Sequence, residues 1–282
     1  MATGVFRSFG IGALAARAAL AWIRRDPRAA ELHRTNFRGR TVTLAAGPAL
    51  AAGATVAAAF GAPSRPVAAA AVTAGSVSGA VGFYDDVVGG RPEQKAAKGF
   101  AGHLGALRDG RVTSGLVKIA GVGAGGLAAA ALLAADPARP RRGVVGGAID
   151  VLLGAGVIAG TANLVNLLDL RPGRAIKASA LIGAPLAVGR RGGVAAGTLG
   201  AGASLLPADL GEEIMLGDAG ANALGALLGV ALAARTGPAG RALALTLLAA
   251  LTAASEKVSF TKVIQDTPWL RTLDELGRRP PA

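Results

Sequence analysis

Long apolar runs alternate with short polar and basic stretches along the chain. A helix needs roughly 20 apolar residues to cross a bilayer, and the pattern predicts nine spans, near residues 5–23, 43–60, 66–83, 114–134, 143–166, 175–189, 192–207, 214–234 and 239–255. The sixth and seventh are short and separated only by a Gly-Arg-Arg-Gly sequence, so they form either two spans or one tilted hairpin. The predicted fold class is all-α: a polytopic membrane protein of about nine transmembrane helices, in a single domain over residues 1–255.

Composition supports this class. The 282 residues are 52% hydrophobic and 17% charged, with a mean hydropathy of +0.48, which lies outside the usual range of soluble domains. Alanine and glycine dominate the spans, and small side chains let transmembrane helices approach closely. The chain has no cysteine, so any metal site must use oxygen or histidine ligands. Residues 5–23 are expected to be a retained first span, because Arg17 interrupts the apolar run of a secretion signal.

The net charge of +13 is scattered between spans rather than gathered in one stripe, which argues against a nucleic-acid partner. Alternation of the spans places 19 Lys and Arg residues on one side and nine on the other, with Arg17 and Lys118 within spans. The positive-inside rule makes the richer side cytoplasmic. On that side lie residues 24–42, 84–113, 167–177, 205–213 and 256–282.

The last of these segments, residues 256–282, is predicted to be a cytoplasmic basic amphipathic tail. Between Ser259 and Arg279 its apolar positions recur at helical spacing, as Val263, Ile264, Leu270, Leu273 and Leu276. Such a helix is expected to lie on the membrane surface.

Acidic residues recur at the cytoplasmic ends of the spans, where carboxylates beside hydrocarbon are costly and call for a chemical reason. Asp85 and Asp86 close the third span. Two adjacent carboxylates suit Mg²⁺, with substrate phosphates completing its octahedron, and their repulsion favours one of them as a proton acceptor. The alternative is a helix end that simply meets solvent.

Two further motifs lie on the same side. Asn163, Asn166 and Asp169 are spaced i, i+3, i+6 and share one helix stripe, which suits binding of ribose, phosphate or metal-bound water; interhelical hydrogen bonding is the alternative. Gly217-Asp218-Ala219-Gly220 opens the eighth span, where the helix dipole also favours an ordinary N-terminal Asp. A single cytoplasmic site would collect all three motifs, and a divalent cation would explain their acids.

Among the remaining polar residues, one is a candidate for the site and the others are expected to have structural or solvated positions. Lys118 is the only lysine within an apolar segment and either meets a diphosphate or snorkels to the surface. Asp150, toward the outer half of the fifth span, is expected to form a structural hydrogen bond or ion pair. His33 and His103 are the only histidines, and isolated loop histidines are typically solvated.

These motifs, in this order, resemble the polyprenyl-phosphate N-acetylhexosamine-1-phosphate transferase superfamily, which is glycosyltransferase family 4-like. The matching features are the Asp85-Asp86 pair, the Asn-x-x-Asn-x-x-Asp sequence 163–169, the Gly-Asp-x-Gly sequence 217–220, and 113–118, which resembles the entrance to the family's fourth helix. The resemblance covers nearly the whole chain.

The resemblance implies an Mg²⁺-dependent enzyme of the cell membrane that transfers a sugar-1-phosphate from a UDP-sugar to a polyprenyl phosphate and releases UMP, in cell-envelope or peptidoglycan synthesis. It assigns catalysis to Asp85, Asp86 and Lys118, substrate binding to Asn163, Asn166 and Asp169, and metal binding to Asp218 and Asp86. A homodimer is left open beside a monomer.

The sequence differs from the family pattern in three respects. Leu170 follows Asp169 where members usually have glycine, and the chain has fewer spans than members commonly have. No histidine follows His103, so the histidine-rich late loop of the family's peptidoglycan translocase is absent. The donor sugar is therefore left open. Two rival interpretations are a non-catalytic relative that binds polyprenyl phosphate or an envelope-synthesis partner, and a transporter with discontinuous helices.

Overall fold

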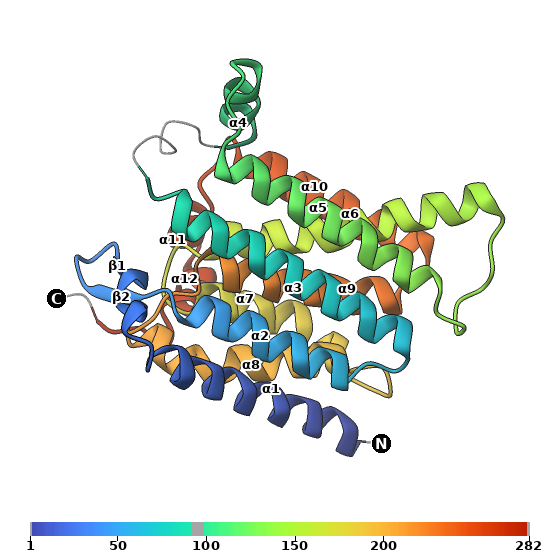
Figure 1. Cartoon of the computed structure of the whole chain (residues 1–282), viewed down its shortest axis with the longest axis horizontal. Coiled ribbons are helices and arrows are strands. Elements are labelled where there is room, and N and C mark those ends of the chain that lie inside the picture. Colours follow the sequence, from blue (N-terminus) through green and yellow to red (C-terminus); the bar gives the residue numbers. More distant parts are fainter. Residues whose placement is uncertain (1, 92–98, 281–282) are drawn as a thin grey trace.

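The computed structural model describes residues 2–91 and 99–280, and these residues are mostly helical (Figure 1). Lys95 and Lys98, counted above on the cytoplasmic side, lie outside them. The long helices are α1 (Ala2–Ile23), α2 (Ala46–Phe60), α3 (Arg65–Val88), α5 (Ser114–Ala134), α6 (Val144–Leu168), α8 (Gly193–Leu210), α9 (Gly217–Arg235) and α10 (Pro238–Ser255). The shorter elements are η1 (Pro27–Leu32), β1 (His33–Thr35), β2 (Thr41–Thr43), α4 (Gly99–Arg108), α7 (Arg174–Gly183), η3 (Pro185–Ala187), α11 (Phe260–Asp266) and α12 (Pro268–Glu275).

Among the described residues, six helices are long and apolar enough to cross a membrane: α1, α3, α5, α6, α9 and α10. They lie side by side with α2 and α8 (Figure 1), and α9 is the most buried of the six. Its neighbours are α2, α3, α6 and α8, while α10 packs mainly on α6 and is largely exposed. The six spans agree with a multi-pass membrane protein.

Three of the nine predicted spans are shorter than a full crossing helix or less apolar. The α2 helix has 15 residues, and α8 is not among the six. A continuous helix over 175–189 is wrong, because α7 ends at Gly183 and the segment goes on as the 3-10 turn at Pro185. The Arg235 side chain, at the end of α9, donates to the carbonyl oxygens of Leu186 and Val188, so this broken segment still passes from one end of the bundle to the other.

One end of the bundle carries all the small elements next to the predicted motifs, and it is called the site end here. It holds the C-terminal ends of α3 and α6, the N-termini of α5 and α9, the β1–β2 hairpin, α11 and α12 (Figure 1). The hairpin is a departure from the predicted all-α class. Its strands pair antiparallel, with His33 opposite Thr43, and Thr43 bridges to Ile214 ahead of α9.

The opposite end of the bundle is held by a buried charge cluster. Arg241, 2% exposed, lies 2.7 Å from the carboxylate of Asp150 and donates to the carbonyl oxygen of Ala233 at the end of α9. Arg139 also pairs with Asp150, at 3.5 Å, and donates to the same carbonyl. The predicted structural ion pair of Asp150 is confirmed, and it joins α6, α9 and α10.

Candidate active site

Three predicted residues meet at the site end around one ammonium group. Lys118 Nζ, from the first turns of α5, lies 2.6 Å from Asp85 Oδ2 and 2.5 Å from Asp218 Oδ2. The side chains of Lys118 and Asp85 are 17% and 12% exposed, and that of Asp218 is 27% exposed. The cation bridges α3, α5 and α9, and Ser114 is a further hydrogen-bond partner of Asp85. Two half-buried carboxylates therefore converge on a position that attracts positive charge.

Asp86 has a different environment from its neighbour. Its Oδ1 accepts a hydrogen bond from the backbone N–H of Asp218 and its Oδ2 one from that of Ala219, both at 2.9 Å. A carboxylate there satisfies the orphan donors at the start of α9 and interacts favourably with the helix dipole. Gly217 has φ +59°, and a Cβ there would meet the Asp86 carboxylate at 2.7 Å. The first glycine of the motif thus lets α9 begin directly on Asp86.

The two asparagines of the predicted stripe have different environments. Asn163 Nδ2 donates to Thr252 Oγ1 of α10 at 3.0 Å, which is the interhelical bond foreseen as the alternative. Asn166 Oδ1 is buried without a hydrogen-bond partner in the described part of the chain. Asn222, one turn after Asp218, donates to the Asp218 carbonyl oxygen at 2.7 Å. The three amides line the same cavity.

That cavity lies between α5, α6, α9 and α10 and has a volume of about 410 Å³. Its polar lining residues are Lys118, Asn163, Asn166, Asn222, Thr252 and Glu256. Its body is apolar and is lined by Ile119, Val122, Ala159, Leu245, Leu248 and Ala249. The α10 helix, which forms one wall of the cavity, is itself largely exposed.

Asp169 ends α6 on the side of the site away from this cavity. It lines a smaller hollow of about 180 Å³ with Phe37, Arg171, Asp209 and Glu212 among its other walls. Burial raises the pKa of Asp169 well above its usual value, and the carboxylates of Asp209, Asp218 and Asp86 add to the rise. The hollow therefore brings Asp169 close to the other acids at the site end.

Several residues at the site carry no motif that identifies them. Asp209, at the end of α8, is buried, and its pKa is raised to about 6, mainly by that burial. Arg34 of β1 donates to the backbone oxygen of Asp86 at 3.2 Å and brings a further cation to the end of α3. The spacing of Asn222 from Asp218, one helical turn, was a signal that could have identified it; Asp209 and Arg34 offer no local signal.

Two of the acidic residues suit a magnesium ion whose coordination is completed by substrate phosphates. Among the described residues, no group of three or more His, Asp or Glu side chains is arranged as a protein-only metal site. Mg²⁺, however, is usually held by one or two carboxylates, with waters and substrate phosphates as its remaining ligands. Asp85 and Asp218, which converge on the Lys118 ammonium, form such a pair, whereas both Asp86 oxygens are engaged with backbone N–H groups.

Comparison of the chain with models of known protein families and with curated proteins finds no match.

Proposed function

We propose that the protein is an Mg²⁺-dependent transferase that moves a sugar-1-phosphate from a UDP-sugar to a polyprenyl phosphate and releases UMP. The observation that carries the proposal is the position of Lys118. Its ammonium group lies between Asp85 and Asp218, and Lys118 also lines a largely apolar cavity between helices. A cation, a pair of metal-type carboxylates and an apolar cavity then adjoin, as transfer between a nucleotide donor and a lipid phosphate requires.

The apolar cavity is the proposed site of the acceptor. The first part of the polyprenyl chain would lie along Leu245, Leu248 and Val122, and its phosphate would reach Lys118. Asn166, whose Oδ1 has no partner in the described residues, would bind a hydroxyl or water beside the phosphate. The exposed position of α10 supports entry of the acceptor from the bilayer.

The proposed reaction forms one bond and breaks one. An acceptor phosphate oxygen bonds to the sugar-bearing phosphorus of the donor, the bond from that phosphorus to the bridging oxygen breaks, and UMP leaves with that oxygen. Asp218 and Asp85 would hold Mg²⁺, which supplies charge neutralisation for the diphosphate. Lys118 would neutralise the incoming phosphate, and Asp86 would keep the start of α9, and with it Asp218, in position. Asp169 would face the donor from the hollow.

The topology that goes with this proposal has nine crossings and a cytoplasmic active site in the cell membrane. In this topology each predicted span would be one pass of the chain between the two ends of the bundle, with 174–188 as the broken pass. Broken helices are tolerated where other helices cover them. The acids lie at the helix ends, whereas a transporter would be expected to hold them at mid-depth.

The test is release of UMP from a panel of UDP-sugars by the purified protein with undecaprenyl phosphate, with and without Mg²⁺. Asp218→Asn and Lys118→Met are expected to abolish release, because the first removes a metal ligand and the second removes the phosphate cation. Asp109→Asn is the matched control, because Asp109 is 69% exposed and lies outside the motifs. Release unchanged in Asp218→Asn would contradict the proposal, and silence across the panel with lipid phosphate still bound would favour a non-catalytic binding protein.

A further inference from the structure

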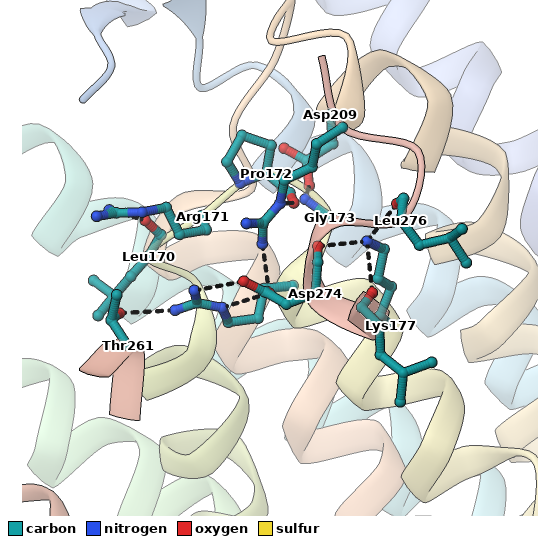
Figure 2. Close-up of polar contacts among 12 residues, drawn as sticks. Leu170, Arg171, Pro172, Gly173, Lys177, Asp209, Thr261, Asp274 and Leu276 are labelled. Carbon is teal, nitrogen blue, oxygen red and sulfur yellow. Dashed lines mark hydrogen bonds and ion pairs between the residues drawn. The ribbon is translucent and has the colours of Figure 1, made fainter. Parts of the chain in front are cut away.

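The C-terminal helix pair is tied to the core by one buried carboxylate. Asp274 of α12, 8% exposed, receives two parallel hydrogen bonds from Arg174 at the start of α7: Nε to Oδ1 at 2.8 Å and Nη2 to Oδ2 at 2.9 Å (Figure 2). Arg278 donates to the same Oδ1 at 2.5 Å. Bidentate pairing of this kind is strong and geometrically specific. Instead of one helix on the membrane surface, the tail forms two short helices, of which α12 is bound to the protein.

The surrounding groups strengthen the same attachment. The third nitrogen of the Arg174 guanidinium, Nη1, donates to Thr261 Oγ1 of α11 at 2.9 Å. Lys177 Nζ donates to the backbone oxygens of Leu273, Asp274 and Leu276 (Figure 2), so that α7 supplies a cation to the C-terminal end of α12. Burial acts to raise the pKa of Asp274, but the hydrogen bonds from Arg174 and Arg278 outweigh it and hold that pKa below its usual value.

The tail also holds the turn that follows Asp169. Arg278 Nε donates to the carbonyl oxygen of Pro172 at 2.8 Å, and Asp209 Oδ2 accepts the N–H of Gly173 on the other side of the turn (Figure 2). Gly173 has φ +74°, a conformation that glycine adopts without strain. The turn is therefore fixed from two sides, although it is the segment in which the chain departs from the family sequence.

The opposite wall of the small hollow is held by the same tail. Arg38, in the β1–β2 loop, donates to the backbone oxygens of Arg279 and Pro280 and pairs with Glu212 at 2.8 Å. The guanidinium of Arg171, from the turn, lies 4.3 Å from the centre of the Phe37 ring of this loop. The tail thus contacts two of the three segments that line the hollow, the β1–β2 hairpin and the turn after Asp169.

We propose that the C-terminal tail is part of the active site and that Asp274 is a positioning residue. Through Arg174 and Arg278, Asp274 fixes the 169–173 turn, and this turn forms the donor-binding side of the site. The inference rests on the proposed transferase function. The hollow at the site end is lined by charged and polar residues suited to a water-soluble UDP-sugar, and it shares no lining residue with the acceptor cavity. Loss of the contact between Asp274 and Arg174 should therefore weaken binding of the UDP-sugar and leave binding of the polyprenyl phosphate unchanged.

The test compares Asp274→Asn with Asp274→Glu and with the matched control Glu275→Gln, which alters an exposed carboxylate in the next position of α12. Asp274→Asn is expected to raise the KM for the UDP-sugar about tenfold, because the strong bidentate pair that holds the turn is lost, with the KM for polyprenyl phosphate unchanged. Asp274→Glu, which keeps the charge, should recover part of the loss. Equal changes in both KM values, or none, would overturn the inference.

A second readout needs no activity. In the full-length protein, amide hydrogen exchange over 169–176 and 36–40 should rise several-fold in Asp274→Asn and remain at the wild-type level in Glu275→Gln, because local opening sets exchange. Unchanged exchange in Asp274→Asn would overturn the positioning role. If the wild-type protein releases no UMP but exchange rises as expected, the proposed transferase function fails, while the role of Asp274 in fixing the 169–173 turn is upheld.

Discussion

The carboxylate of Asp86 accepts the backbone N–H of Asp218 at 2.9 Å, so the aspartate pair that ends α3 is joined directly to the motif that begins α9. The two members of the pair divide their roles. Asp85 faces Lys118, whereas both oxygens of Asp86 serve the first turn of α9. The position of Asp218 therefore depends on a residue 132 positions earlier in the chain.

Asp86→Ala is expected to impair both stability and turnover. Loss of a helix cap costs about 1 kcal/mol of unfolding free energy. Displacement of the α9 N-terminus moves Asp218, and a shift of about 1 Å at a catalytic group can reduce the rate by about 100-fold. Thermal unfolding in detergent and UMP release measure the two effects. A variant with wild-type melting and wild-type release would show that the cap has no role; Asp109→Asn again serves as the control.

Much of the site could be predicted because its residues lie at span ends that fall on the same side of the bundle. Asp85, Lys118 and Asp218 each end or begin an apolar run, and alternation across a bilayer brings such ends to one side. Lys118 was identifiable as the only lysine within an apolar run. The sequence pattern also located the six long apolar helices of the described residues, and Asp150 as a structural ion-pair residue.

The remainder depends on contacts that leave no local pattern. Arg174 and Asp274 are 100 positions apart, and each resembles an ordinary surface charge in its own segment. The β1–β2 hairpin has strands of only three residues, too short for an alternating pattern, and its loop is held by the ion pair of Arg38 with Glu212. The helix over 175–183 continues in sequence as an apolar run, so its end at Gly183, ahead of Pro185, was not apparent.

The charge cluster at the opposite end of the bundle gives a prediction about stability alone. Arg241→Met removes a guanidinium that is 2% exposed and leaves Asp150 with only the longer 3.5 Å contact to Arg139. Breaking a buried pair by removing one partner costs about 3–5 kcal/mol. The melting temperature in detergent should fall strongly, while UMP release per folded molecule should remain normal, because the cluster lies at the other end of the helices.

The double variant Arg241→Met, Asp150→Asn tests the reason for that loss. With the uncompensated carboxylate also removed, much of the stability should return. A double variant that is no more stable than Arg241→Met would mean that the hydrogen bonds of Arg241 to Ala233, rather than its charge, hold this end together.

The proposed orientation of the bundle can be measured by cysteine labelling, because the natural chain contains no cysteine. Lys257→Cys places an exposed thiol at the site end and Ala138→Cys places one in the α5–α6 loop at the other end. A membrane-impermeant maleimide added to intact cells should label only Ala138→Cys, and permeabilised cells should show both. Labelling of Lys257→Cys alone would reverse the orientation and move the site to the outside, where cytoplasmic UDP-sugars do not reach it.

Asp209 provides a prediction about pH. Burial raises its pKa in the folded protein to about 6, although the Gly173 N–H, Arg278 and Lys177 oppose the rise. A folded-state pKa above the unfolded value of about 3.9 means that the folded protein binds the proton more tightly. The resulting contribution to stability is complete below pH 4 and is lost as the pH rises to about 6, by roughly 3 kcal/mol in total.

Asp209→Asn should remove this dependence, because the amide oxygen can still accept the hydrogen bond from the Gly173 N–H while nothing at the position ionises. The variant should melt at a higher temperature than the wild-type protein above pH 6, and the difference should shrink toward pH 4. Asp266→Asn, an exposed carboxylate at the end of α11, is the control and should follow the wild-type curve. A constant difference at every pH would show that the ionisation of Asp209 is not what lowers stability. A gain in stability together with slower UMP release would instead show that this buried charge serves the hollow beside Asp169, since functional sites commonly retain groups that cost stability.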